Sequence, residues 1–233
     1  MHTRNLIRFL GIFALSLITC GTLHADDDAD WTPLFTADGI PEGWVVTPWN
    51  DLAAEAPAGS EWRVEDGVLH PGVERGTWLM SEREYGNFVL EYEILLTELG
   101  NSGCALRAPM FGDPAFDGME MQMADFRYNM EANESELTAA IYRAIAPSQQ
   151  VYQPTEWNHF IIELNGSHLK VTHNDVVVQD VDLNDYDQPT LRHDGSEAPP
   201  VKDRPTSGHI GFQHLSRENE PVQIRNVRIR ELP

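Results

Sequence analysis

The sequence predicts an all-β protein, an antiparallel sandwich in preference to a barrel. Short segments that alternate apolar and polar residues run through most of the chain, which is the pattern of strands with one buried face. Turn signals rich in Gly, Pro, Asn and Asp separate these segments, and no segment carries a long helical period. This order of elements is typical of two sheets packed on one core.

The first 25 residues have the pattern of a secretory signal peptide. Arg4 and Arg8 precede an apolar run over residues 9–18, small residues follow, and the chain turns acidic at residue 26. The run is shorter than the about 20 residues that a membrane span needs. We therefore expect cleavage after Ala25 and an extracytoplasmic protein, periplasmic or secreted. A lipid anchor at Cys20 is the weaker alternative, because Thr19 stands where such signals usually have Gly, Ala or Ser.

The rest of the chain is expected to form one domain. Residues 26–30 read as an acidic linker, and residues 31–233 as a single domain, since sandwiches of about 200 residues are often undivided. Beyond the leader, Cys104 is the only cysteine, so no internal disulfide is expected. Because free cysteine is usually buried, we expect Cys104 to pack in the core and not to act as a nucleophile.

The chain carries a strong negative charge. Its 37 acidic and 16 basic side chains give a formal net charge of −21. This charge argues against nucleic acid and against anionic membrane surfaces as partners. A small neutral ligand such as a sugar is compatible with it.

The elements are predicted in order along the chain. Residues 31–49 read as an edge segment with loops, and residues 51–60 as a single helical turn that Pro57 ends. Hairpins are predicted around Asp66-Gly67, between residues 62–64 and 68–70, and around Asn174-Asp175, between residues 168–173 and 176–181. Further strands are predicted over residues 76–80, 87–98, 101–107, 119–124, 137–143, 157–165, 208–215 and 222–232.

Two irregular features interrupt this order. In the last strand the apolar phase shifts at Arg225-Asn226, and a bulge there would keep both apolar pairs on the core side. Residues 182–207 form a long segment rich in Pro, Asp and Gly. A loop of that length inside a compact domain is usually functional or mobile.

The stretch from residue 101 to residue 125 holds the candidate site. Met119, Met121 and Met123 alternate with Glu120 and Gln122, so the glutamate and the glutamine share the polar face of a strand. The same alternation in the preceding segment would put Arg107 on that face. Asp125 is out of phase by one residue and joins the face only if the strand end bulges.

These side chains point to chemistry on a small molecule. Glu120 and Asp125 are candidates for acid–base work, and Arg107 for contact with a carbonyl oxygen or an oxyanion. An exposed polar sheet face with ordinary ion pairs is the competing interpretation. A retaining glycosidase needs two carboxyl groups about 5–5.5 Å apart, and the position two residues after Glu120 is the amide Gln122.

Other polar residues are weaker candidates. Tyr142 could present a hydroxyl group or simply pack, and strict alternation puts His214 in the apolar phase and Gln213 on the opposite face. The histidines lack metal-ligand spacing, and the acidic run at residues 182–187 lacks the glycine and final glutamate of a calcium loop. No cofactor is indicated, and a divalent metal remains open.

The ordered motifs resemble the bacterial 3-keto-disaccharide hydrolase family over residues 31–232. The matches are LFTADGIPEGW, WRVEDGVL, YGNFVLEYEI, NSGCALR, GMEMQMAD, TAAIYRAIAP, EWNHFII, GHIGFQHL and IRNVRIREL. Each motif alone is a weak signal, whereas their sequence over nearly the whole chain is specific.

This resemblance implies a concanavalin/LamG-like jelly-roll sandwich of two antiparallel sheets and an exported enzyme that cleaves 3-keto-glycosides or 3-keto-disaccharides. A ketone at C3 acidifies the hydrogen on C2, so a base can start elimination of the glycosidic oxygen, and water then adds. The positions that match the family motifs assign Glu120, Asp125 and Arg107 to catalysis. The substrate-binding positions implied are Gln122, Tyr142 and Gln213, and we add His214 and Asn101 as further candidates for substrate binding.

One departure from the family pattern keeps other functions open. The family pattern near the C-terminus reads Gly-Leu-Gln-x-His, whereas this chain reads Gly-Phe-Gln-His-Leu, so Leu215 stands at the histidine position and His214 one place earlier. A carbohydrate-binding module without turnover is therefore one alternative. An ordinary jelly-roll endoglycosidase is the other, and Gln122 argues against it.

Overall fold

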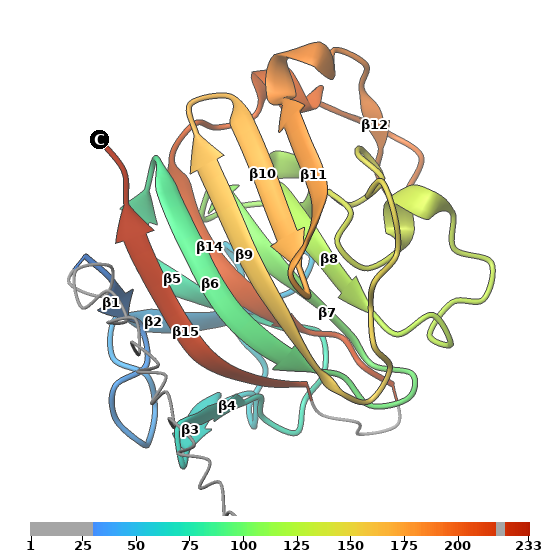
Figure 1. Cartoon of the computed structure of the whole chain (residues 1–233). Coiled ribbons are helices and arrows are strands. Elements are labelled where there is room, and N and C mark those ends of the chain that lie inside the picture. Colours follow the sequence, from blue (N-terminus) through green and yellow to red (C-terminus); the bar gives the residue numbers. More distant parts are fainter. Residues whose placement is uncertain (1–29, 218–221) are drawn as a thin grey trace, which may run out of the picture. The chain divides into compact units, whose positions relative to one another are not determined.

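Two antiparallel sheets form the body of residues 31–233 in this computed structural model, which describes residues 30–217 and 222–233 (Figure 1). The larger sheet contains, from edge to edge, β11 (Val176–Asp182), β10 (His168–His173), β9 (Trp157–Asn165), β6 (Phe88–Leu95), β15 (Gln223–Glu231), β4 (Val68–His70) and β3 (Arg63–Glu65), with β1 (Thr32–Pro33) paired to β15. The smaller sheet contains β2 (Trp44–Pro48), β5 (Thr77–Tyr85), β14 (Gly208–His214), β7 (Asn101–Ala108) and β8 (Met119–Ala124).

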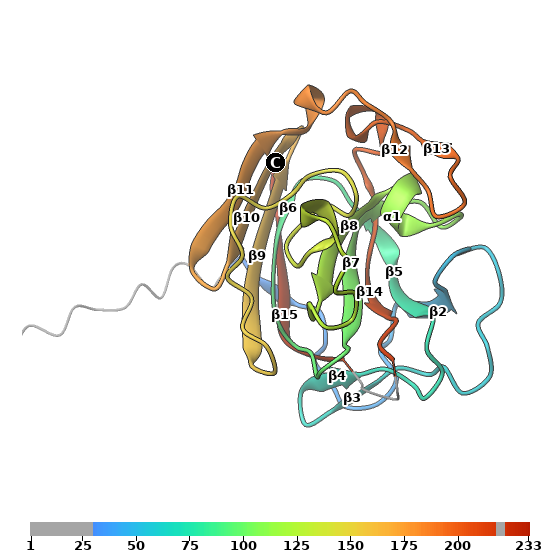
Figure 2. The same cartoon turned by 90° about the vertical axis from the view of Figure 1, so that its right-hand side faces the viewer.

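The two sheets lie face to face and confirm the predicted sandwich (Figure 2). Strands distant in sequence alternate within each sheet, as in a jelly roll. The short elements lie in the connections between the strands. They are α1 (Pro114–Asp117), η1 (Glu134–Glu136), η2 (Leu183–Asp185), β12 (Thr190–Leu191), β13 (Glu197–Ala198) and η3 (Val201–Asp203).

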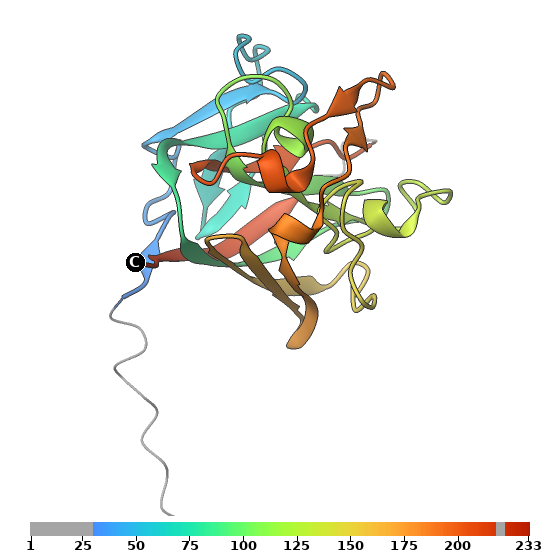
Figure 3. The same cartoon turned by 90° about the horizontal axis from the view of Figure 1, so that it is seen from above.

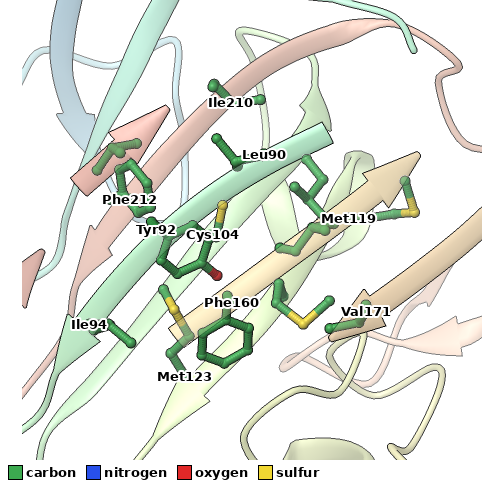
Figure 4. Packing of buried hydrophobic residues seen from close by; sticks show 14 of the residues in the cluster. Leu90, Tyr92, Ile94, Cys104, Met119, Met123, Phe160, Val171, Ile210 and Phe212 are labelled. Atoms are coloured by element: carbon green, nitrogen blue, oxygen red, sulfur yellow. The ribbon is translucent and has the colours of Figure 1, made fainter. Parts of the chain in front are cut away.

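The core lies between the facing sheets and follows the alternation of the strands. On β6, Phe88 and Leu90 are fully buried, and on β8 the three methionines point inward against them. Figure 4 shows Met119, Met123 and Cys104 packed with aromatic residues from both sheets. Burial of one such side chain contributes about 1.5–3 kcal/mol. Because the methionines are on the core side, the residues that alternate with them are on the outer face of the five-stranded sheet.

Both predicted hairpins and the predicted bulge are present. Asp66 and Gly67 take φ of 51° and 75°, and Asn174 and Asp175 take 47° and 64°, as the tight hairpin turns that match strand twist require. In β15 the pairing with β6 shifts between residues 225 and 228, and Asn226 takes φ of 55°. The bulge therefore keeps the apolar residues on either side of it facing the core, as the sequence predicted.

Three local predictions need correction. Residues 137–143 form no regular strand, because Ala139 and Arg143 take positive φ values of 70° and 57° that interrupt an extended chain. The segment instead runs along the edge of β8, with a hydrogen bond from the Gln122 amide to the Ala140 carbonyl at 2.9 Å. Residues 51–60 form turns without a helix. Residues 182–207 are structured by η2, β12, β13 and η3.

The prediction of a signal peptide over residues 1–25, the alternative anchor at Cys20 and most of the linker lie outside the described residues. Among the residues that the structure describes, no helix is long and apolar enough to cross a membrane. Cys104 is buried and free, as expected.

Candidate active site

A cavity of about 310 Å³ opens on the outer face of the five-stranded sheet. It is lined by residues from the sheet and from the loops that border it: Trp49, Arg75, Asn101, Asp113, Ala115, Glu120, Gln122, Tyr128, Tyr142, His193, Gln213 and Leu215. Glu120, Gln122, Tyr142, Gln213 and Asn101 were candidates from the sequence, and the structure brings these five together.

A second hollow, of about 500 Å³, lies against the larger sheet. Its acidic groups are already neutralised: Glu91 pairs with Arg228, and Glu93 with Arg225. A site for a polar ligand needs side chains that are free to bind it, so the smaller cavity is the better candidate.

The β7–β8 pair builds the floor of the cavity. In the register of the two strands Ala105 lies opposite Glu120 and Gly103 opposite Gln122, so the two polar side chains stand over small residues. A Cβ atom at residue 103 would collide with the Glu120 carboxyl group. The glycine is therefore what allows this carboxyl group to lie close to the sheet.

Glu120 and Asp113 form a pair of acidic groups with different proton affinities. Glu120 is only 4 % exposed, and burial, reinforced by the charge of Asp113, raises its pKa well above the ordinary value. Burial, and to a lesser degree the charge of Asp117, also raises the pKa of Asp113, to about 6, against the opposing effect of its hydrogen bond. Both carboxyl groups are therefore weaker acids than usual, and burial favours the protonated form of Glu120.

Asp113 is held in place by the short helix that it caps. Its Oδ1 accepts a hydrogen bond from the Ala115 amide at 3.0 Å, and Pro114 follows at the first helical position. The sequence analysis did not select Asp113, although an acidic residue directly before a proline is a helix-start signal. What the sequence could not show is that α1 begins at the wall of the cavity.

Two side-chain amide oxygens at the site have no hydrogen-bond partner. The Asn101 Oδ1 and the Gln213 Oε1 are buried and accept no hydrogen bond within the described residues. An unsatisfied buried acceptor costs about 1–3 kcal/mol, which a ligand hydroxyl group can offset. These amides are suited to bind a polyhydroxylated ligand.

Arg75 supplies a positive charge at the cavity. Its Nη2 donates to the Leu215 carbonyl at 2.7 Å and to the Tyr128 hydroxyl at 3.4 Å, and its Nε donates to the Ser216 carbonyl at 3.0 Å. The guanidinium group is therefore held against the cavity wall by the chain that follows β14. No sequence pattern marks Arg75, because it lies in the irregular connection before β5.

Aromatic side chains cover part of the cavity. The His193 ring lies 5.9 Å from the Trp49 ring, 5.8 Å from the Tyr142 ring and 5.4 Å from the Phe116 ring, measured between centroids. Burial raises the pKa of Tyr142 to about 12, so its hydroxyl group remains a hydrogen-bond donor at neutral pH. The sequence analysis did not select Trp49 and His193, because they lie in loops that are distant in sequence from residues 101–125.

The placement of Arg107 corrects a prediction. Leu106 and Arg107 form a bulge against β14, where the register shifts, and Arg107 takes φ of 50°. Its side chain donates to the Gly86 carbonyl at 2.8 Å, the Gly166 carbonyl at 2.8 Å and the Asn87 Oδ1 at 3.2 Å. Arg107 does not line the cavity and instead ties together three segments of the sandwich.

Asp125 is placed beside the main cavity and not in it. It lines an adjoining hollow of about 60 Å³, and Arg127 binds both of its oxygens at 2.7 Å while the Tyr152 hydroxyl donates at 3.2 Å. Burial opposes ionisation, but these hydrogen bonds outweigh it and lower the pKa of Asp125. A carboxylate so firmly paired is poorly suited to exchange protons with a ligand.

His214 faces away from the cavity. It is 3 % exposed and follows the apolar phase of β14, as strict alternation indicated, while Gln213 points to the site. Burial and the charge of Arg75 lower the pKa of His214 to about 4, so it is neutral at neutral pH. Leu215 reaches the cavity wall in its place.

The metal question was left open by the sequence. Within residues 30–217 and 222–233, no group of three or more His, Cys, Asp or Glu side chains is placed to hold a metal ion. The chemistry that the described side chains can perform is proton transfer by Glu120 and Asp113, with hydrogen bonding by the amides around them.

The chain is similar to solved structures of other proteins over most of its length. The chain matches a solved structure from Parabacteroides distasonis, named as a candidate glycosyl hydrolase, with 28% identity, a TM-score of 0.70, and coverage of 87% of this chain and 99% of that one. A second such structure from the same organism matches with 22% identity, a TM-score of 0.67, and coverage of 91% and 98%. No curated protein matches.

A more distant structure supports the fold alone. LamAcat from Zobellia galactanivorans matches with 14% identity and a TM-score of 0.51, covering 89% of this chain and all of that one (100%). Together these comparisons describe a glycosidase-like, carbohydrate-active jelly-roll protein. The model of the family described as a 3-keto-alpha-glucoside-1,2-lyase-like domain matches residues 30–230, and this chain therefore belongs to that family.

Proposed function

We propose that this protein is an exported enzyme that cleaves 3-keto-glycosides by elimination followed by hydration. The observation that carries the proposal is the pair of carboxyl groups in one cavity: Glu120 is buried with its pKa raised well above the ordinary value, and the pKa of Asp113 is raised to about 6. Groups whose environments separate their pKa values in this way are suited to act as acid and base in one reaction. The family description supports the 3-keto substrate, and the pattern of residues 1–25 supports export.

The reaction requires a base, an acid and a group that stabilises an enolate oxygen. A base removes the proton from C2, and the electron pair moves to the C3 oxygen as an enolate. The enolate then expels the glycosidic oxygen from C1, which takes a proton from an acid, and leaves a C1=C2 double bond conjugated to the C3 ketone. Water adds its oxygen to C1 and a proton returns to C2, so the net change is hydrolysis.

The cavity side chains fit these steps. Asp113, ionised and held by its cap hydrogen bond, is assigned as the base, and Glu120, protonated, as the acid for the leaving oxygen. Arg75 carries the positive charge that would stabilise the enolate oxygen. The unpartnered amides of Asn101 and Gln213 would bind sugar hydroxyl groups.

The alternatives lead to different expectations. A binding module needs no carboxyl group with a raised pKa, and burial of Glu120 would then be only a cost. The presence of Leu215 in the cavity wall is the feature that favours such a module. An ordinary retaining endoglycosidase needs a second carboxylate as nucleophile and does not need an oxidised sugar.

The test is cleavage of an aryl 3-keto-α-glucoside by the protein and by Glu120→Gln, Asp113→Asn and the exposed control Glu82→Gln. We expect release of the aryl group by the wild type and by the control, and a loss of kcat/KM of about 10²- to 10⁴-fold in the other two. Asparagine preserves the cap of α1. Saturable binding without release would instead support the binding module. Cleavage of an unoxidised polysaccharide would support the endoglycosidase.

A further inference from the structure

A row of three aromatic rings crosses the outer face of the five-stranded sheet. Trp49 directly follows β2, at one edge of the sheet, and its backbone amide donates to the Gly76 carbonyl at 3.0 Å. Tyr142 lies beyond the other edge, where its amide donates to the Glu120 carbonyl on β8 at 2.9 Å. The His193 ring stands between them, 5.9 Å from one ring and 5.8 Å from the other.

His193 is carried by a hairpin that is firmly attached to the sandwich. His193 lies in the turn between β12 and β13. This hairpin stands beside α1 (Figures 2 and 3). The neighbouring Arg192 binds both oxygens of Asp117 in α1, at 3.0 and 2.6 Å. Such a two-point charged contact fixes orientation as well as distance.

A buried arginine completes the attachment. Arg204, 5 % exposed, donates to the Ala115 and Gly118 carbonyls, each at 3.1 Å, and to the Thr190 hydroxyl at 2.6 Å. One guanidinium group therefore joins both ends of α1 to the first strand of the hairpin. The place of His193 over the cavity is set by these contacts and does not depend on a bound ligand.

The His193 side chain has no other structural task among the described residues. Its ring nitrogens make no hydrogen bond there, and its ring contacts are to Trp49, Phe116 and Tyr142. Burial and the charge of Arg143 lower its pKa, so the imidazole is neutral at neutral pH and can both donate and accept a hydrogen bond.

We propose that the Trp49–His193–Tyr142 row closes the cleft across the sheet, so that the site accepts a terminal glycosyl unit and excludes a unit inside a chain. A sugar chain that continued in both directions along the sheet would have to pass through this row. The volume of about 310 Å³ lies at the lower end of the range for small-molecule sites, which fits a short glycoside. His193 is thus a specificity-determining residue. The inference rests on the proposed function in that the ligand is a sugar.

A matched pair of ligands tests this inference. In 3-keto-maltose the oxidised unit is terminal, and in cyclodextrin oxidised at C3 of one unit the same ring with the same linkage is internal. Binding to the Glu120→Gln variant, measured by titration calorimetry, reports the site whether or not turnover occurs. We expect 3-keto-maltose to bind at least about 100-fold more tightly than the cyclic ligand, because the row would exclude the cyclic ligand by steric clash.

Substitutions at residue 193 test whether the preference for the terminal unit depends on the row. Added to Glu120→Gln, His193→Ala is expected to reduce the preference at least about 10-fold through tighter binding of the cyclic ligand, while His193→Phe keeps a ring and should preserve the preference. His168→Ala, an exposed histidine of the other sheet, is the control. Thermal unfolding checks that each variant is folded.

The outcomes separate the two proposals. Equal binding of both ligands, an unchanged preference in the alanine variant, or no binding of either ligand overturns the inference about the row. The proposed function is judged separately, by release from the aryl 3-keto-α-glucoside with the unsubstituted protein. Release without a preference for the terminal unit would leave the function standing and remove the role of His193.

Discussion

At the scale of single residues, the burial of Glu120 has a cost that depends on pH. Its pKa in the folded protein is raised above the unfolded value, so its contribution to stability is fully present below the unfolded pKa and is lost as pH rises through the folded pKa. Each unit of difference between the two pKa values corresponds to about 1.4 kcal/mol. Burial of Glu120 thus reduces the free energy of unfolding at neutral and alkaline pH.

Replacing this acid tests that account. Glu120→Gln has nearly the same shape and does not ionise, so we expect it to raise the melting temperature at pH 8 and to change it little at pH 4. Thermal unfolding across that pH range measures the effect, with the exposed Glu82→Gln as the matched control. A variant that is equally destabilised at every pH would show that Glu120 is not a buried, protonated acid.

Asp113 determines how the activity should respond to acid. Its pKa is raised to about 6, and the proposed base must be ionised, so kcat/KM should fall below about pH 6 as the carboxylate takes up a proton. At high pH the rate should fall again when Glu120 loses its proton. A pH–rate profile measures both limbs. Constant activity from pH 5 to pH 8 would remove Asp113 from the role of base.

Gly103 controls the position of the Glu120 carboxyl group. An added Cβ would collide with that group, whereas the glycine's own backbone does not require a positive φ. We expect Gly103→Ala to fold and to lose about 100-fold in kcat/KM, since small displacements of a reacting group have effects of that size. Gly86→Ala is the control, because a Cβ there meets open space. Full activity in Gly103→Ala would mean that the carboxyl position is not critical.

At the scale of elements, the alternation of strand residues was sufficient to predict much of the site. The three methionines of β8 identify its core side, and therefore place Glu120 and Gln122 on the open face. The alternation of β14 likewise separated Gln213 from His214. These predictions succeed because the buried side of a strand is fixed by the cost of exposing its apolar residues.

The same reasoning failed where a strand is irregular. The alternation of residues along β7 predicts that Arg107 and Glu120 share the outer face of the sheet. The bulge at residues 106–107 instead turns the Arg107 side chain toward the Gly86 and Gly166 carbonyl groups. A single extra residue moves every later side chain of the strand to the opposite face, and nothing in the local sequence marks it. The prediction for Asp125 was wrong for a different reason, because its carboxylate pairs with Arg127 two residues later.

The revised role of Arg107 gives a prediction about stability. Arg107→Met removes the donor to the Gly86 and Gly166 carbonyl groups and one of the two donors to the Asn87 Oδ1, and we expect a loss of about 1–3 kcal/mol in the free energy of unfolding. Denaturant unfolding measures the loss. The folded variant should keep its kcat/KM within about threefold below the unfolding transition. A loss of activity without a loss of stability would return Arg107 to the catalytic site.

At the scale of the whole domain, the sheets supply the floor of the site and the connections supply its walls. Trp49, Asp113 and His193 come from three connections that are distant in sequence, and all three line the cavity on the five-stranded sheet. Residues 182–207 were expected to be functional or mobile, and the buried Arg204 is what orders them against α1. Contacts of this kind are tertiary, so no local pattern in the sequence predicts them.

The family and the sandwich were predicted from the sequence because both depend on patterns distributed along the whole chain. Ordered motifs and repeated alternation remain readable even where single positions depart from the pattern. The chemistry depends on fewer residues, and the departure at Leu215 shows why the motifs alone do not assign each role. Leu215 lines the cavity where the family pattern has a histidine, and Asp113 and His193 reach the cavity from other segments of the chain.

The most direct test of the central claim traces the hydrogen on C2. A 3-keto-α-glucoside labelled with deuterium at C2 is cleaved by the protein in ordinary water, and the sugar product is analysed by mass spectrometry against a control without protein. Elimination through Asp113 predicts that the product has lost the deuterium to solvent and that the unsaturated intermediate appears before it. A product formed by the protein that retains its deuterium would contradict the mechanism, because direct displacement at C1 leaves the C2–D bond intact.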